Sequence, residues 1–118
     1  MDIDSGIYVK TVLDLYLALP EAPTRVSRFD HSLAFRLFQQ NVPASIVEAA
    51  FLLASARRLC RPNDASPLGP IRSLHYFLPV IEEITRHPLP PGYLDYLRHK
   101  LAAYRLKSAL TPNPHTHL

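Results

Sequence analysis

The stretch SRFDHSLAFRLFQQNVPASIVEAAFLLASARRLCR, residues 27–61, decides the fold of this 118-residue chain. Its apolar residues recur at intervals of three and four, as expected for two amphipathic helices. The tight polar turn Asn41-Val42-Pro43 separates the two helical patterns. A short helix, a brief turn and a longer helix are typical of helix-turn-helix units and equally of ordinary helical hairpins. The pattern leaves both interpretations open.

Local signals mark where these two helices begin and end. Ser27 and Asp30 match a capping box in its S-x-x-D form, which opens the first helix. Asn41 tolerates the left-handed conformation that ends many helices, and Pro43 fits the first turn of the helix that follows. We therefore predict a second helix over residues 43–59, and its strongly apolar composition places it at the centre of the fold.

Three further helical patterns flank this stretch, over residues 7–19, 71–86 and 93–110. The first is apolar nearly all round, which predicts burial on a wide face, with a cap at Asp4 or Ser5. Pro79 lies inside the second pattern, so we expect a kink or a break into two short helices there. One core should contain apolar residues from all five helices: Leu15, Leu37, Phe51, Ile81 and Leu97, with Tyr104 on the inner stripe of the last helix.

The sequence thus predicts an all-α fold, a compact bundle of about five helices with a helix-turn-helix-like hairpin at its centre. The chain length allows a single domain, which we place at residues 1–110, followed by a flexible tail at residues 111–118. A lone cysteine excludes an internal disulfide, and no apolar run reaches the length of a membrane span. We expect a cytoplasmic protein with no membrane partner.

No residue pattern indicates catalysis or a cofactor. The six histidines are scattered, and His115-x-His117 with one cysteine does not supply the ligands of a zinc site. Cys60 ends an apolar helix, which favours a small core residue over a nucleophile. The adjacent Glu82 and Glu83 diverge on a helix, and the three glycines stand alone, which excludes a glycine-rich phosphate loop. We predict a non-enzymatic protein with no metal, no cofactor and no small-molecule substrate.

Positive charge is concentrated in the C-terminal two-thirds of the chain. Residues 1–50 carry a net charge of −2, residues 51–92 of +2 and residues 93–118 of +3. Helix ends attract cations through the helix dipole, which explains part of this distribution. The same distribution suits phosphate binding, with Tyr76, Tyr93 and Tyr96 offering aromatic faces nearby. The candidate nucleic-acid-binding residues are Arg57, Arg58, Arg61, Arg72, Arg98, Lys100, Arg105 and Lys107.

Residues 30–58, DHSLAFRLFQQNVPASIVEAAFLLASARR, resemble small helical modules of replication-initiation, primase-associated and recombinase-accessory proteins of bacterial mobile elements. The later stretch IRSLHYFLPVIEEI, residues 71–84, is similar to a helix that often follows in such proteins. The resemblance covers about half of the chain and implies a role in DNA transactions, without any catalytic residue. Its positions are Asp30, Leu33, Ala34, Leu37, Val42, Val47 and Ala50.

Two functions follow from these patterns. The first is a nucleic-acid-binding accessory protein in a larger bacterial replication, recombination or RNA-guided complex, with DNA or RNA as its partner. The alternative is a helical protein–protein interaction module that binds a larger protein or a second copy of itself and contacts no nucleic acid. Salt separates the two, because phosphate contacts weaken steeply with ionic strength and an apolar interface does not.

Overall fold

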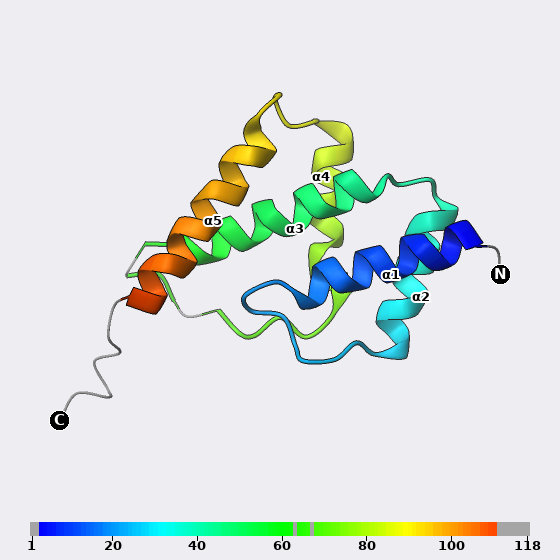
Figure 1. The fold of residues 1–118 in the computed structure, drawn as a ribbon, viewed down its shortest axis with the longest axis horizontal. Coiled ribbons are helices and arrows are strands. Elements are labelled where there is room, and N and C mark those ends of the chain that lie inside the picture. The colour runs from blue at the N-terminus through cyan, green and yellow to red at the C-terminus, as the bar shows by residue number, and fades with distance from the viewer. Residues whose placement is uncertain (1–2, 63, 67, 111–118) are drawn as a thin grey trace.

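The computed structural model describes residues 3–62, 64–66 and 68–110, and in this part of the chain every regular element is helical (Figure 1). The side chains of Ile3 and of residues 105–110 are not described. The all-α bundle of five helices is confirmed, and the tail predicted at residues 111–118 lies outside the described residues. The elements are α1 (Ile3–Leu17), α2 (Arg28–Gln39), α3 (Ala44–Leu59), the 3-10 helix η1 (Leu74–Phe77), α4 (Leu78–Arg86) and α5 (Tyr93–Leu110).

Helix α3 is the centre of the bundle, as its composition predicts. It packs against α1, α4, α5 and η1, whereas α2 packs against α1 and η1. Figure 1 shows α1 and α5 on different sides of α3, with α4 crossing it. A short turn joins α2 to α3, but each of these two helices packs mainly against other elements, and α2 and α3 do not form a closely packed hairpin.

The turn between α2 and α3 has the local geometry that the sequence indicates. Ser27 Oγ accepts a hydrogen bond from the Asp30 amide at 3.2 Å, and Asp30 Oδ2 accepts one from the Ser27 amide at 2.9 Å. Asn41 has a left-handed backbone with φ of 60°. Helix α3 begins at Ala44, one residue later than predicted, because Pro43 is its N-cap and not its first helical residue.

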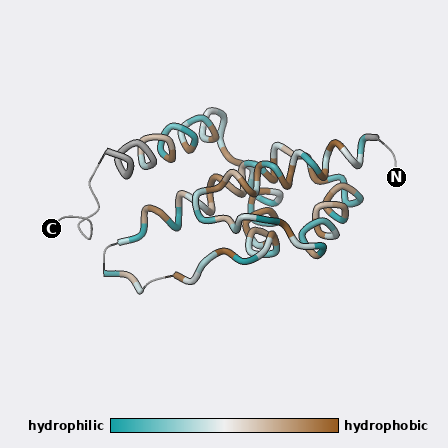
Figure 2. The backbone as a smooth tube through the Cα atoms, turned by 60° about the horizontal axis from the view of Figure 1, so that its bottom comes forward, coloured by the Kyte–Doolittle hydropathy of each residue, from teal (hydrophilic) through white to brown (hydrophobic). Residues whose placement is uncertain are grey.

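The core is built around three aromatic rings from α1, α3 and η1. The ring centroids of Phe51 and Phe77 are 4.8 Å apart, and Tyr16 lies 6.2 Å from Phe51 and 6.1 Å from Phe77. In Figure 2 the apolar segments gather where the helices meet in the middle of the molecule. Edge-on and tilted ring pairs at these distances add to the stabilisation from burial alone.

A buried carboxylate joins α2 to η1. Asp30 is 1% exposed, and its second oxygen, Oδ1, accepts a hydrogen bond from the Leu74 amide at 2.9 Å. One side chain therefore caps α2 and also satisfies an amide at the start of η1. This contact holds the segment before α4 against the N-terminal turn of α2.

The segment with Pro79 is broken, not kinked. The 3-10 helix ends at Phe77 and α4 begins at Leu78, which leaves Pro79 in the first turn of α4. In that turn its missing amide costs no helical hydrogen bond. The sequence left a kink and a break open, and the structure has the break.

Several sequence-based expectations about burial and boundaries are wrong in detail. Helix α1 begins at Ile3, so Asp4 and Ser5 lie inside its first turn and do not cap it. Leu15 is only half-buried, and Tyr104 is exposed, although both were expected in the core. The other four predicted core residues are buried: Leu37, Phe51, Ile81 and Leu97.

Candidate interaction surfaces

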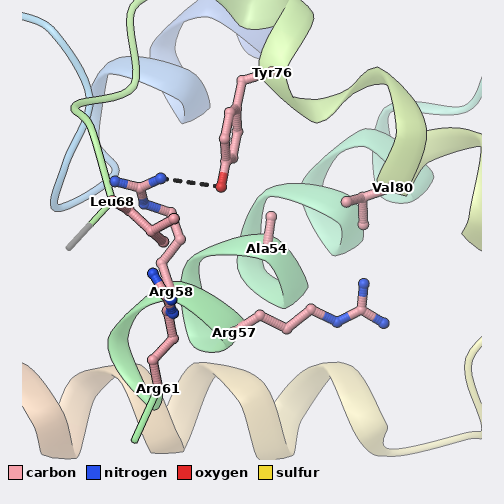
Figure 3. A pocket seen from close by; sticks show the side chains of 7 residues that line it. All are labelled: Ala54, Arg57, Arg58, Arg61, Leu68, Tyr76 and Val80. Atoms are coloured by element: carbon pink, nitrogen blue, oxygen red, sulfur yellow. Dashed lines mark hydrogen bonds between the residues drawn. The ribbon is translucent and has the colours of Figure 1, made fainter. Parts of the chain in front are cut away.

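Arg58 is the most enclosed of the described cations that the sequence assigns to nucleic-acid binding. Its side chain is 5% exposed, and its Nε donates a hydrogen bond to the Glu21 carboxylate. Its Nη1 donates to the Tyr76 hydroxyl at 3.0 Å (Figure 3), and its Nη2 donates to the Gly69 carbonyl at 2.7 Å. Each guanidinium nitrogen therefore has a partner. Arg58 joins three separate chain segments and has little charge left to offer a ligand.

The charge of Arg58 is balanced inside the protein. Burial lowers the pKa of Arg58, but the hydrogen bonds to Glu21 and Tyr76 raise it, and the net direction is upward. The guanidinium carbon also lies 5.2 Å from the centroid of the Tyr76 ring. The Tyr76 ring, which the sequence analysis offers as an aromatic face near the candidate cations, is thus already in contact with Arg58.

Two more of the predicted cations bridge helices. Arg57 on α3 donates from Nη1 and Nη2 to the two carboxylate oxygens of Glu83 on α4, at 2.9 and 2.6 Å. This hydrogen bonding raises the pKa of Arg57 and lowers that of Glu83. Arg98 on α5 donates to Glu48 on α3 and to Asp95 in its own helix, both at 3.0 Å. These arginines tie α4 and α5 to the central helix.

Three predicted cations remain without a carboxylate partner among the residues that the structure describes: Arg61, Arg72 and Lys100. The Lys100 ammonium lies 5.6 Å from the centroid of the Tyr96 ring. A hydrogen bond with the Tyr96 hydroxyl raises the pKa of Lys100. The side chains of Arg105 and Lys107 lie outside the described residues. Of the six predicted cations whose side chains are described, three therefore have no carboxylate partner in the described part of the chain.

A shallow pocket of about 330 Å³ lies over the C-terminal half of α3 (Figure 3). Its lining includes the apolar side chains of Ala54, Leu68 and Val80 together with Arg61. Arg57 points away from Arg58 toward α4, where its partner Glu83 lies. Of the candidate nucleic-acid-binding residues, Arg57, Arg58 and Arg61 line this pocket and Arg72 does not. Of the three that line it, only Arg61 lacks a carboxylate partner among the described residues.

A second depression, which the sequence analysis missed, lies between α1 and the start of α2. It has a volume of about 370 Å³. Its lining comes from one face of α1 and from the residues on either side of the capping box: Gly6, Val9, Lys10, Leu13, Asp14, Leu17, Val26 and His31. The spacing of three and four along α1 is visible in the sequence. The prediction that α1 is buried on a wide face is therefore wrong for the side that lines this depression, which we call the α1 groove.

Large apolar side chains are exposed on α1 and in the first turn of α2. Ile7 is 60% exposed, Leu17 is 36% exposed and Phe29, in the first turn of α2, is 62% exposed. Helix α1 buries Val12 and Tyr16 against the bundle but leaves its opposite side uncovered. Leu17 lines the α1 groove and Ile7 is exposed on the same helix, and exposed apolar side chains of this kind are typical of binding surfaces.

The described residues offer little for metal or thiol chemistry. No group of three or more His, Cys, Asp or Glu side chains in the described part of the chain is arranged to hold a metal ion. Cys60 is exposed, which corrects the expectation that it is a core residue. Within residues 3–110, no helix combines the length and apolar character that a bilayer span requires.

No family model, curated protein or solved structure matches this chain.

Proposed function

We propose that this protein is a non-enzymatic helical interaction module that binds a helix of another polypeptide on the outer side of α1. The α1 groove carries the proposal, because it combines an open apolar depression with two exposed aliphatic side chains, Ile7 and Leu17. Binding of an amphipathic helix in such a groove uses apolar anchors at successive helical turns. The partner helix therefore has apolar residues on one of its faces.

Nucleic-acid binding is the second candidate function, as an accessory role in a replication, recombination or RNA-guided complex. The observation that favours it is the absence of a carboxylate partner for Arg61, Arg72 and Lys100 among the described residues. We place it second because Arg57, Arg58 and Arg98 are paired with carboxylates of the chain itself. Phosphate contacts by these three would have to replace existing ion pairs.

Selection of helical peptides from a displayed library, with the protein at about 1 µM, tests the first candidate. We expect enriched peptides with apolar residues on one face, whose binding persists in about 0.5 M salt because apolar contacts are not screened. Leu17→Glu should abolish their binding. The matched control is Tyr96→Glu, which alters an exposed apolar residue on α5 and should leave binding intact. Peptides that bind both variants equally would contradict the proposal.

Fluorescence anisotropy with labelled single-stranded DNA, double-stranded DNA and RNA tests the second candidate on the same protein. If nucleic acid is the partner, affinity falls steeply with salt, and R61Q/R72Q/K100Q weakens it. The variant R25Q/R28Q/R36Q is the matched control, because it removes three cations that also lack carboxylate partners among the described residues and that are not among the candidate nucleic-acid-binding residues. We expect no salt-sensitive binding from the wild type. Binding lost only in the first variant would reverse our order of the two functions.

A further inference from the structure

Four exposed residues of α1 lie in one narrow line along the helix. Ile7, Lys10, Asp14 and Leu17 follow one another at intervals of three, four and three residues. This is the spacing of the contact positions of a coiled coil, in which intervals of three and four residues alternate and each pair of intervals makes a seven-residue repeat. We call these four residues the seam. The side chains of Lys10 and Asp14 are 77% and 62% exposed. The seam residues other than Ile7 also line the α1 groove, so the seam borders this groove on the exposed side of α1, away from the buried Val12 and Tyr16.

The seam is complementary to itself. Ile7 and Leu17 lie five residues on either side of Val12, and Lys10 and Asp14 lie two residues on either side of it. A second α1 placed antiparallel on the seam, with the two-fold axis outside the helix at the height of residue 12, would set Ile7 against Leu17 of the second copy. The same rotation sets Lys10 against Asp14 of the second copy. Each contact occurs twice, as a two-fold interface requires.

We infer that α1 pairs antiparallel with α1 of a second copy of this chain and forms a two-fold dimer. The inference rests on the proposed function, since it names the helix that the α1 surface binds. The interface has two inner layers of opposite charge, Lys10 with Asp14. Outer layers of Ile7 with Leu17 lie on each side.

The charges select this orientation over the alternative. A parallel, in-register pair would bring Lys10 against Lys10 and Asp14 against Asp14, and like charges at facing seam positions oppose pairing. Within one helix Lys10 Nζ already lies 2.6 Å from Asp14 Oδ2. A lysine that precedes its acidic partner by four residues is the weaker order for such a pair. The pair is therefore free to exchange partners across the dimer axis.

The seam is short, so the dimer is weak. Four contact layers along one helix bury less area than the roughly 1,200 Å² of a stable interface, and we expect a dissociation constant of about 10–100 µM. Apolar residues that line the α1 groove, Val9, Leu13 and Val26, lie beside the seam and add apolar surface. At about 1 µM, the concentration of the peptide selection, the protein is mostly monomeric and the outer side of α1 is available to bind peptides.

Sedimentation velocity of charge-reversed variants tests the inference. K10D gives a seam with two acidic residues and D14K gives a seam with two basic residues, so each should weaken self-association at least about tenfold. An equimolar mixture of K10D and D14K should restore dimers, because every facing pair is then again of opposite charge. The double variant K10D/D14K should self-associate like the wild type. Far-UV circular dichroism checks that each variant is folded, and Leu17→Gln tests the apolar layers independently.

If mixing K10D with D14K restores dimers, the effect must come from contacts between chains. Each single variant lacks the ion pair within its own helix, and mixing cannot restore that pair. A wild type that stays monomeric to about 0.5 mM overturns the dimer. A dimer whose dissociation constant is unchanged by all these substitutions also overturns the inference, because such a dimer must use another surface. The interaction-module proposal is decided separately by the helical peptides, which bind a monomeric protein on the same face.

Discussion

Two tyrosine hydroxyls on α1 have opposite environments. Tyr16 is fully buried and its hydroxyl has no hydrogen-bond partner among the described residues, whereas the Tyr8 hydroxyl donates to the Val42 carbonyl at 2.7 Å. Burial raises the pKa of both to about 12, and the charge of Asp30 adds to the shift of Tyr16. A buried hydroxyl without a partner is destabilising, because folding removes its hydrogen bonds to water.

Replacing each tyrosine by phenylalanine should therefore have different effects. Tyr16→Phe should leave the free energy of unfolding unchanged or raise it by up to about 1 kcal/mol, because only an unsatisfied polar group is lost. Tyr8→Phe should lower it by about 1 kcal/mol, the usual contribution of one hydrogen bond. Urea denaturation of both variants measures the difference. A loss larger than about 1 kcal/mol in Tyr16→Phe would show that its hydroxyl has a partner in solution.

At the level of single residues, the sequence predicts contacts that are close along the chain. Ser27 and Asp30 are three residues apart, and the capping box that they form follows from local geometry. The contact between Asp30 and the Leu74 amide spans 44 residues, and no local pattern indicates it. The sequence shows that Asp30 is a good capping residue, but not that the same carboxylate joins two elements.

The start of α4 gives a prediction at the level of the element. Pro79 lies in the first turn of α4, where it removes no helical hydrogen bond and limits the freedom of the unfolded chain. Pro79→Ala should thus lower stability by up to about 1 kcal/mol, observed as a lower melting temperature. As a comparison, Pro88→Ala alters a proline in the connector between α4 and α5.

The opposite result would have a specific meaning. A higher melting temperature for Pro79→Ala would show that, once the proline is removed, η1 and α4 gain stability by merging into one helix. Circular dichroism at 222 nm would then also report more helix in the variant than in the wild type. A loss confined to Pro88→Ala would place the stabilising rigidity in the later connector.

The elements themselves were predictable, since periodicity and proline positions mark them. The last helix was predicted at residues 93–110, and the structure has α5 at Tyr93–Leu110. The face that each helix buries was less predictable. Helix α1 has apolar residues on more than one side, so periodicity alone could not show that Tyr16 lies in the core and Ile7 in solvent. That choice depends on where α2 and α3 pack.

At the level of the whole molecule, the predicted cations illustrate what the sequence does not contain. Arg57, Arg58 and Arg98 find carboxylates 26, 37 and 50 residues away along the chain. Net charge by region correctly locates the basic residues but cannot reveal these pairings, which exist only after folding. The same limit hid the α1 groove, because it lies between two elements.

Arg58 gives a prediction for the whole molecule, since it connects α3 to Glu21, Tyr76 and Gly69 at once. Arg58→Met keeps the aliphatic part of the side chain and removes the charge and hydrogen bonds. It should lower the free energy of unfolding by about 2–4 kcal/mol, because hydrogen bonds to charged groups are the stronger kind. Urea denaturation measures the loss. Arg61→Met, three residues on, is the control and should change stability by less than about 0.5 kcal/mol. Equal effects would show that the connections of Arg58 contribute little.

The packing of α5 has a consequence for how the protein opens. Its main packing partner is α3, through Leu97 and Leu101, with the Arg98–Glu48 ion pair alongside. Helices α1, α3 and α4 are each held by more than one neighbour. A helix with one partner can detach while the others stay in place, so α5 forms a separate cooperative unit of low opening free energy. Its amide hydrogens should exchange with solvent well before those of α3, and among the helices α5 should be the first that a protease cleaves in the native protein.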